Sequence, residues 1–253
     1  MRIGVVSAML IWSSLAAVAF GQDGETVEIQ DLIDQPTAGI LEKGQYSFDA
    51  RLFPYGGALA GLRAGLFESF MIGISYGGRN IIGRGDPEWN ELPGVLIKFR
   101  LVEETALPAV ALGFDNQGFG LWSDTLNRYE VKAKGLFAVF SKNFSLGWAG
   151  YFGIHGGVNF NTFEDDDDRN MNGFAGFDKN LGRQVFVLAE YNLALDDNAW
   201  EALGKNRGFL NAGVRWQIAK PLSLEADFKD LLLNQKDASS PGREVRIIYV
   251  ETL

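Results

Sequence analysis

The single histidine, His155, is the side chain whose possible chemistry is easiest to define. It lies in the stretch GIHGGVNFN, on the same alternating side of a predicted strand as Asn159 and Asn161. A serine hydrolase would need this residue as the base between a serine and an aspartate. A histidine-based metal site would need several ligands, which one histidine cannot supply. We therefore predict an interior hydrogen-bonding role for His155, with no catalytic residues and no such metal site.

Two further stretches resemble ligand-binding motifs. The run EDDDDR, Glu164 to Arg169, is rich in carboxylates of the kind that bind Ca²⁺, but it lacks the glycine and final glutamate of an EF-hand loop. We expect a solvated loop tip, with weak divalent-ion binding as the alternative. The stretch GGALAG, residues 56–61, has no βαβ setting for a dinucleotide and is interpreted as a tight turn followed by a bendable strand. No cofactor is expected.

Composition limits the classes of partner. The chain has 253 residues, a formal net charge of -9, 47% hydrophobic residues and no cysteine. An acidic chain lacks the basic footprint that nucleic acid requires, so no nucleic-acid partner is expected. The absence of cysteine is unusual for an exported eukaryotic domain and typical of bacterial outer-membrane proteins.

The first residues predict export. The start of the chain has one arginine, an apolar run from Ile3 to Phe20 and small residues at Ala19 and Gly21. This pattern predicts a secretory signal peptide over residues 1–21, with a membrane anchor as the competing interpretation. No later segment is apolar for the roughly 20 residues that a transmembrane helix needs, so a mature chain that crosses a membrane does so as strands.

Period-2 alternation of apolar and polar residues runs from Gly44 to the C-terminus and predicts about twelve strands. We place them at Gln45–Phe53, Ala58–Leu66, Phe70–Gly77, Val95–Leu101, Leu107–Asp115, Tyr129–Lys142, Trp148–Thr162, Asn172–Lys179, Gln184–Leu195, Gly208–Ile218, Leu222–Lys229 and Arg243–Glu251. Residues 22–43 have a weak pattern and are interpreted as a periplasmic lead-in. Residues 44–253 are predicted to form one transmembrane, up-and-down antiparallel β-barrel.

The connections between these strands alternate in length, which supports the barrel. Short turns, including Phe67–Ser69 and Ala219–Pro221, alternate with long polar loops such as Gly78–Gly94 and Asp230–Gly242. Short periplasmic turns and long external loops are typical of outer-membrane barrels. The first external connection, Pro54–Gly57, is the exception because it is short.

The two sides of the predicted strands differ in character. The apolar side carries aromatic residues at both ends, as membrane interface belts require: Tyr46, Phe99, Trp216 and Tyr249 near short turns or termini, and Tyr76, Phe114 and Phe160 near long loops. The polar side is predicted to line a lumen, with Arg51, Arg63, Lys98, Arg100, Lys132, Lys134, His155, Asn159, Glu190, Arg215, Glu225 and Asp227 as the lining residues. In a soluble sandwich the same side would face water, which is the alternative fold. The pattern leaves open whether the lumen is a narrow polar pore or is plugged by ion pairs.

Several stretches resemble the YjbH-like family of bacterial outer-membrane barrels. They include PTAGILEKGQYSFDARLFPYGG, GISYGGRNIIGRGDPEWN, LPAVALGFDNQGFG, FLNAGVRW and the terminal REVRIIYVETL, and the likeness runs from about Pro36 to Leu253. None of these strings is a catalytic signature. The resemblance implies an outer-membrane barrel linked to the production or export of exopolysaccharide.

Together these features predict a non-enzymatic, monomeric barrel in the bacterial outer membrane. Its expected partners are outer-membrane lipid, the barrel-insertion machinery and either polysaccharide or small polar solutes. A structural surface barrel with a plugged lumen is one alternative. An outer-membrane lipase is another, which would require catalytic groups beside His155 at the outward rim, and the sequence has none evidently placed there.

Overall fold

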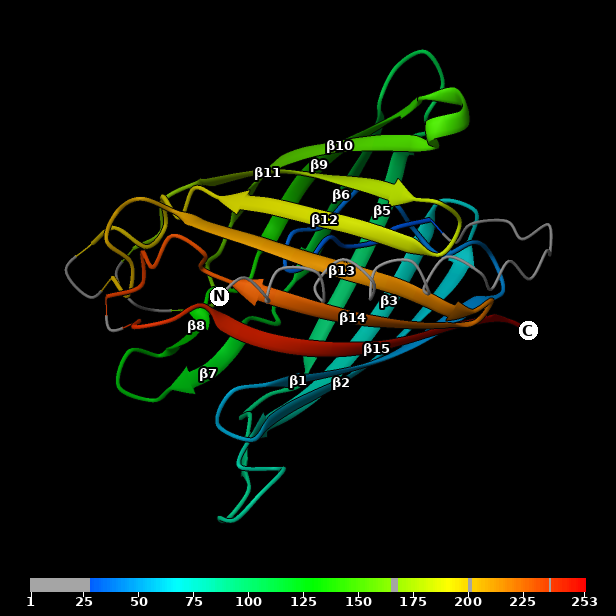
Figure 1. The fold of residues 1–253 in the computed structure, drawn as a ribbon. Coiled ribbons are helices and arrows are strands. Elements are labelled where there is room, and N and C mark those ends of the chain that lie inside the picture. Colours follow the sequence, from blue (N-terminus) through cyan, green and yellow to red (C-terminus); the bar gives the residue numbers. More distant parts are fainter. Residues whose placement is uncertain (1–27, 165–167, 200–201, 237) are drawn as a thin grey trace, which may run out of the picture.

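In the computed structural model, which describes residues 28–164, 168–199, 202–236 and 238–253, antiparallel strands wrap around one axis (Figure 1). Within this described part of the chain, twelve of them form the wall. They are β1 Gln45–Phe53, β2 Gly57–Phe67, β3 Phe70–Arg79, β5 Gly94–Val102, β6 Ala109–Asp115, β9 Gly135–Ser145, β10 Tyr151–Phe160, β11 Asn172–Leu181, β12 Val185–Asn192, β13 Phe209–Ala219, β14 Leu222–Lys229 and β15 Gly242–Thr252. The predicted number and order of wall strands are confirmed. The predicted signal peptide, residues 1–21, lies outside the described residues.

The wall closes between its first and last strands. β1 pairs with β15 from Gln45 opposite Thr252 to Leu52 opposite Val245, and β1 also pairs with β2. Every wall strand therefore has a hydrogen-bonded neighbour on both sides. Closure leaves no sheet edge, which is the condition for a sheet to cross a lipid bilayer.

Among the described residues, four short elements lie outside this wall. β4, Glu88–Trp89, pairs with the end of β3, and η1, Gly147–Ala149, is a single 3-10 turn. β7, Phe119–Ser123, and β8, Arg128–Val131, form a separate hairpin. The predicted strand Tyr129–Lys142 is thus wrong at its start: its first residues belong to β8, and the wall strand begins at Gly135. Gly135 has φ +62°, a left-handed conformation that interrupts the extended chain between the two strands.

The alternation of short and long connections is confirmed, with one shift in position. The turn expected around Asn143 lies further along, because β9 continues to Ser145 and the chain reverses over residues 146–150. Trp148, predicted as the first residue of a strand, is instead in this turn and is fully exposed. The C-terminus and the start of β1 lie at the end of the barrel with the short turns, because β15 ends beside the start of β1.

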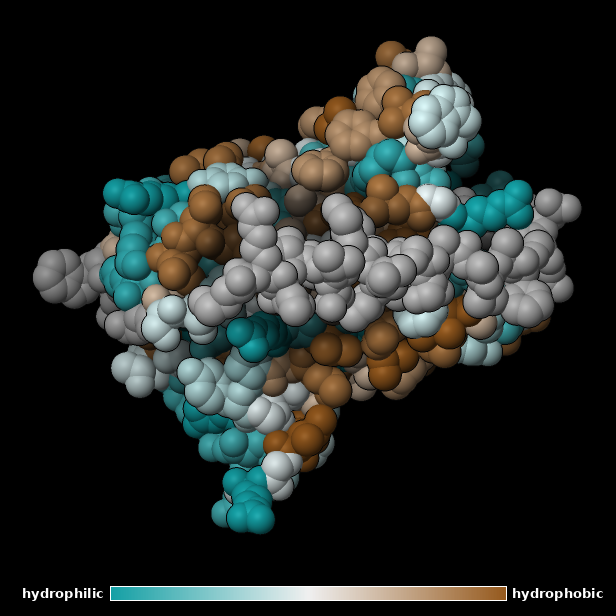
Figure 2. Space-filling model, in the orientation of Figure 1, coloured by the Kyte–Doolittle hydropathy of each residue, from teal (hydrophilic) through white to brown (hydrophobic). Residues whose placement is uncertain are grey.

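The outer face of the wall is apolar along its length. Leu62, Ile74, Leu112, Phe140 and Val214 are all exposed although they are large and apolar. Figure 2 shows such side chains in brown along the barrel, with hydrophilic residues in teal over the loop end. In water this surface would be unfavourable, whereas a closed barrel with an apolar outer face fits a bilayer. The protein is therefore an outer-membrane β-barrel.

Aromatic residues lie toward both ends of this outer face. At the end with the short turns, the rings of Tyr46 and Tyr249 lie 6.3 Å apart between centroids. At the end with the long loops, Tyr76 stacks on Trp89 at 5.6 Å. These positions match the membrane interface, where amphipathic aromatic rings are favoured. No helix among the described residues has the length and hydropathy needed to cross a membrane.

Candidate functional site

The interior of the barrel is occupied by the chain itself. Residues 28–43, hereafter the plug, enter from the end with the short turns, where Glu28 pairs with Arg100 at 2.7 Å. The plug reverses direction inside the barrel through an Asp31–Pro36 bridge and a hydrogen bond from the Leu32 amide to the Gln35 carbonyl at 2.9 Å. The periplasmic lead-in expected for this segment is therefore corrected, because residues 30–41 are buried except for the half-buried Asp31.

One carboxylate of the wall binds the tip of the plug through its backbone. Glu190 on β12 accepts amide hydrogen bonds from Ile33 at 3.0 Å, Asp34 at 3.0 Å and Gln35 at 2.9 Å. Three successive amides converging on one anion form a nest, in which each bond is strengthened by the charge. Asn211 of the neighbouring strand donates to the same carboxylate at 2.8 Å, so the tip is held in a defined place.

Cationic side chains bind the carbonyl groups of the plug. The Lys98 ammonium group donates to the carbonyls of Gln30 at 2.8 Å, Thr37 at 3.2 Å and Gly39 at 3.1 Å, which uses all three of its donors. Arg215 donates to the carbonyls of Asp31 and Leu32 at 3.1 and 3.0 Å. The barrel therefore satisfies backbone groups that would otherwise be buried without partners.

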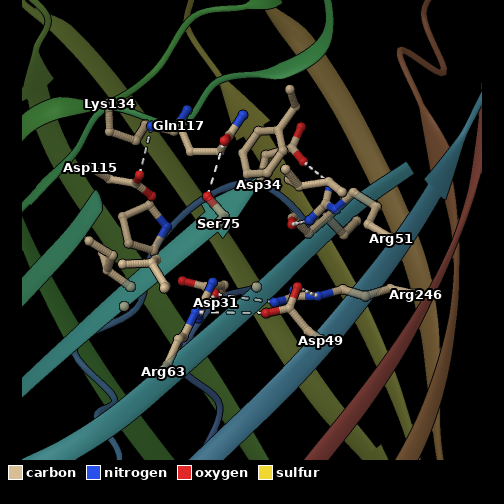
Figure 3. A pocket seen from close by; sticks show the side chains of 18 of the residues that line it. Asp31, Asp34, Asp49, Arg51, Arg63, Ser75, Asp115, Gln117, Lys134 and Arg246 are labelled. Carbon is tan, nitrogen blue, oxygen red and sulfur yellow. Dashed lines mark hydrogen bonds and ion pairs between the residues drawn. The ribbon is translucent and has the colours of Figure 1, made fainter. Parts of the chain in front are cut away.

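Two aspartates of the plug form ion pairs with the wall. The Asp34 carboxylate pairs with Arg51 at 2.7 Å and with Lys229. The Asp31 carboxylate pairs with Arg63 and lies 3.6 Å from Arg246 and 3.9 Å from Lys98. Figure 3 shows Asp31 and Asp34 of the plug among Arg51, Arg63 and Arg246, which come from different strands of the wall. Because such charges are costly to bury alone, the plug and the wall depend on each other for neutralisation.

Apolar side chains of the plug also pack against the wall. Leu32 and Ile33 pack with Phe186 and Leu188 of β12, while Ala38 and Ile40 belong to a second buried cluster. The wall members of that second cluster are Met71, Leu96, Ala109, Ala111, Phe137, Val139 and Phe174. The inner surface is thus only partly polar, and its apolar side matches the apolar side chains of the plug.

Six of the residues expected to line the lumen contact the plug directly: Arg51, Arg63, Lys98, Arg100, Glu190 and Arg215. Glu225 is fully buried and pairs with Arg215, while Asp227 is buried without a hydrogen-bond partner among the described residues. Arg100 lies at the periplasmic end with Glu28. Asn159 is buried and donates to the Lys134 carbonyl at 3.2 Å. The structure thus gathers half of the twelve predicted residues around one segment.

His155 lies in a three-residue array that the sequence did not indicate. Its Nδ1 is 2.7 Å from the Ser141 hydroxyl, and its Nε2 is 2.8 Å from Asp178. The Ser141 hydroxyl also accepts the Ala38 amide of the plug at 2.8 Å. All three side chains are buried in the interior, away from the outward rim where a lipase site was considered. The array resembles a hydrolase triad in composition, but here it anchors the plug.

Lys132 and Lys134 lie on the link between β8 and β9 rather than on a wall strand. The Lys132 ammonium group donates to the carbonyls of Asp168 and Asp196, so this residue ties loops together at the mouth of the barrel. Lys134 is buried near the interior cavity that Asp31 also lines. These two lysines therefore belong to different parts of the inner surface.

The acidic run also differs from the expected solvated tip where it is described. Glu164 is buried and accepts the amides of Tyr129 at 2.9 Å and Ala133 at 3.1 Å. Burial raises the pKa of Glu164 to about 7, although the amide hydrogen bonds and nearby cationic side chains oppose the shift. Asp168 is buried as well and accepts the amides of Asn198 and Ala199. No group of three potential metal ligands occurs among the described residues.

Above the plug, the external end of the barrel contains a vestibule of about 920 Å³. Its floor includes Asp34 and Gln35 of the plug together with Lys229 and Asn211, and its walls include the aromatic residues Phe53, Tyr55, Trp122 and Phe209. By contrast, the cavities beside the plug measure only about 40 and 60 Å³, enough for a few waters. The plug therefore separates a wide external chamber from the periplasmic end.

Sequence reasoning missed the partners that the plug supplies, chiefly Asp31 and Asp34. The signal was present in the stretch DLIDQPTAGI, where two carboxylates alternate with apolar residues in a segment too short to form its own core. Lys229 and Arg246 share the charged side of their strands with the predicted residues and were likewise left out of the lining set.

No protein-family model matches the chain, and no curated protein matches it. Among solved structures, the chain is similar to the KdgM porin at 8% identity and a TM-score of 0.47, over 83% of this chain and 99% of that one. It is also similar to Salmonella typhi OmpF in complex with daunomycin at 15% identity and TM-score 0.35, over 76% and 61% of the two chains. It is similar as well to Acinetobacter baumannii Omp33, at 8% identity and a TM-score of 0.36, over 83% of this chain and 97% of that one. TM-scores this low leave fold and function to be argued from the chain itself.

Proposed function

We propose that the protein is a monomeric, non-enzymatic outer-membrane channel for small polar solutes, and that the plug holds it closed. The observation that carries this proposal is the way the plug is inserted. It enters and leaves by the periplasmic end, with Glu28 beside Arg100 and the Gly44 amide bonded to the Gly65 carbonyl at 3.0 Å. Such a loop can withdraw into the periplasm without being threaded through the barrel.

The contacts of the plug suit a reversible closure. Its backbone is bound by side chains of the wall instead of being paired as a strand of the sheet. Withdrawal therefore breaks side-chain hydrogen bonds and ion pairs while the barrel ladder stays intact. The Gln35 side chain has no hydrogen-bond partner among the described residues although it is fully buried, which weakens the closed state.

A non-enzymatic role is supported by the surroundings of His155. The Ser141 hydroxyl is engaged by the Ala38 amide and lies under the plug, so the array has neither a free nucleophile nor an approach for substrate. The array also lacks backbone amides aimed at a reacting carbonyl among its described contacts, which an acyl-transfer site needs.

The test is a disulfide that locks the plug to the wall. Ala38 and Ser141 are in contact, with 2.8 Å between the amide nitrogen and the hydroxyl oxygen, and the chain has no native cysteine. In planar bilayers, Ala38→Cys/Ser141→Cys should show discrete current steps when reduced and lose them when oxidised. Each single cysteine variant should be insensitive to the oxidant. Current that is equal in both redox states, or no current in either, would contradict the proposal.

A second candidate is passage or assembly of exopolysaccharide, which the resemblance to the YjbH-like family favours. The feature of this chain that supports it is the vestibule, where aromatic faces stand beside polar side chains at the external mouth. Aromatic rings beside hydrogen-bonding groups are the usual lining of small-molecule pockets. A neutral oligosaccharide added to the external side should then block the current of the reduced double-cysteine protein, and Trp122→Ala should weaken that block.

A further inference from the structure

The carboxylates of the plug occupy positions where the wall concentrates cations. Arg63, Lys98 and Arg246 surround the Asp31 carboxylate, and their side chains are 16%, 0% and 5% exposed. Among the described carboxylates, Asp31 is the only one within ion-pair distance of Lys98, at 3.9 Å. Arg63 has one alternative partner, Asp49 at 4.0 Å. Arg246 keeps Asp49 at 3.3 Å and Glu225 at 4.0 Å, so withdrawal of the plug removes the neutralising carboxylate chiefly from Lys98 and Arg63.

The second carboxylate repeats this arrangement nearer the vestibule. Asp34 pairs with Arg51 and Lys229, which share one other ion-pair partner among the described carboxylates, Glu244, at 2.9 and 3.7 Å. Lys229 and Asp34 both line the vestibule, so a solute that arrives from outside can reach this cluster from the vestibule. The two cationic clusters thus form a path from the vestibule toward the periplasmic end.

The remaining contacts define what else a ligand should carry. Glu190 accepts three hydrogen bonds from the plug, and Lys98 and Arg215 donate five in total to its carbonyls. A solute that replaces the plug would need carboxylates for the two cationic clusters, together with nearby hydrogen-bond donors for Glu190. A neutral solute would leave Lys98 without an ion pair and Arg63 with only Asp49 at 4.0 Å, which is costly where the solute excludes water.

From these contacts we infer that the open lumen contains a binding site for small solutes bearing carboxylates, and that Asp31 and Asp34 occupy this site in the closed state. The plug then acts as a built-in competitor. A carboxylate-bearing solute that binds the cations favours withdrawal of the plug, because both cannot occupy the same groups. This inference rests on the proposed function, since it concerns the lumen that the plug closes.

The first experiment measures competition and does not depend on current. Gln35 is fully buried at the tip of the plug, and Gln35→Cys places the only thiol of the chain there. In vesicles, a membrane-impermeant thiol reagent should label this cysteine severalfold faster when triglutamate is added outside. Triglutamine, which has the same shape without the charges, should leave the rate unchanged. Equal effects of the two peptides, or none, would overturn the inference.

Two matched variants show where in the barrel triglutamate acts. Arg63→Gln in the Gln35→Cys chain should abolish the response to triglutamate. Arg243→Gln should preserve it, because Arg243 is exposed on the vestibule wall and has no described contact with the plug. A response that survives Arg63→Gln and disappears with Arg243→Gln would place the anion in the vestibule and overturn the assignment. Citrate distinguishes the ligand class: the same response to citrate assigns carboxylates in general, and a response to triglutamate alone assigns acidic peptides.

The second experiment measures selectivity of the open lumen. Asp31→Asn/Asp34→Asn removes the competing carboxylates from the plug, and its folding is checked by heat-modifiable migration on a gel. Its current under a salt gradient should favour anions over cations, and a cation preference would overturn the inference. If this variant does not fold, the labelling of Gln35→Cys decides the question. Failure of the disulfide test overturns the gating proposal, whereas failure of the labelling test overturns only the anion site.

Discussion

The outer and inner faces of the barrel wall place different requirements on their side chains. On β13, Val214, Trp216 and Ile218 are exposed on the outer face, which a bilayer would cover. Arg215, between them, faces inward and is bonded to Glu225 and to two carbonyls of the plug. An outward residue therefore needs only to be apolar, whereas an inward residue needs a particular partner. The loss of stability caused by a polar substitution on the outer face should therefore depend on the depth of the residue in the membrane. On the inner face, the loss should depend on which contact the substitution removes.

The largest effect is expected on the outer face. Val214 lies in the middle of β13 and is 46% exposed. Val214→Arg should destabilise the barrel by about 2–4 kcal/mol, because a charge is placed near the middle of the bilayer. Ile218→Arg, near the end of the same strand, should cost only about 0–1 kcal/mol. Unfolding by denaturant in lipid vesicles measures both, and equal losses would contradict the assignment of faces.

An inner-face substitution should loosen the plug without unfolding the wall. Glu190→Gln removes the charge that binds three amides, at a cost of about 1.5–3 kcal/mol to the closed state. Labelling of Gln35→Cys should therefore accelerate by roughly one to two powers of ten. Glu130→Gln, in a vestibule wall residue with no described contact to the plug, is the control and should leave the rate unchanged. Similar rates in the two variants would mean that Glu190 does not hold the tip.

The stability of the folded protein should depend on pH through Glu164, a buried carboxyl group at the mouth of the barrel. The pKa of Glu164 is raised from 4.5 to about 7 by burial, so the folded protein keeps a proton that the unfolded chain has lost. Stability should therefore fall as pH rises from about 4.5 to 7, by at most about 1.4 kcal/mol per pH unit, and level off above pH 7. Denaturant titrations across this range provide the measurement. Glu164→Gln should reduce the slope, because it removes the proton that Glu164 contributes, and an unchanged slope would assign the pH dependence to other groups.

The smallest expected effect is an increase in the stability of the closed state. The Gln35 amide is buried without a partner, so Gln35→Leu replaces an unsatisfied polar group by an apolar one of similar size and should strengthen closure by about 1 kcal/mol. Labelling of Ala38→Cys, whose side chain is buried in the same plug, should slow about fivefold. Gln35→Ala also removes the amide but leaves a cavity, so it should not slow the labelling. Faster labelling of Gln35→Leu would indicate that the amide has a partner in the closed state.

Much of the wall could be predicted from the order of residues. The alternation in segments such as Gln45–Phe53 identifies strands because the side-chain period of a strand is two. The same alternation assigns Val214 and Arg215 to opposite faces. It failed at Tyr129–Lys142, where alternation continues through a link that Gly135 interrupts. A periodic pattern shows which side a residue faces, but not whether the strand belongs to the wall or to a hairpin.

The sequence by itself determined a closed antiparallel barrel with an apolar outer face, because alternation and the lengths of connections are local properties of the chain. Only the tertiary structure decided that residues 28–43 fill the lumen. Each partner of Asp31 and Asp34 comes from a distant strand, such as Arg63 on β2 and Lys229 on β14. Likewise, Ser141 and Asp178 meet His155 only through the register of β9, β10 and β11. Ion pairs and hydrogen bonds across a lumen depend on which strands face each other, and no local period in the sequence records this.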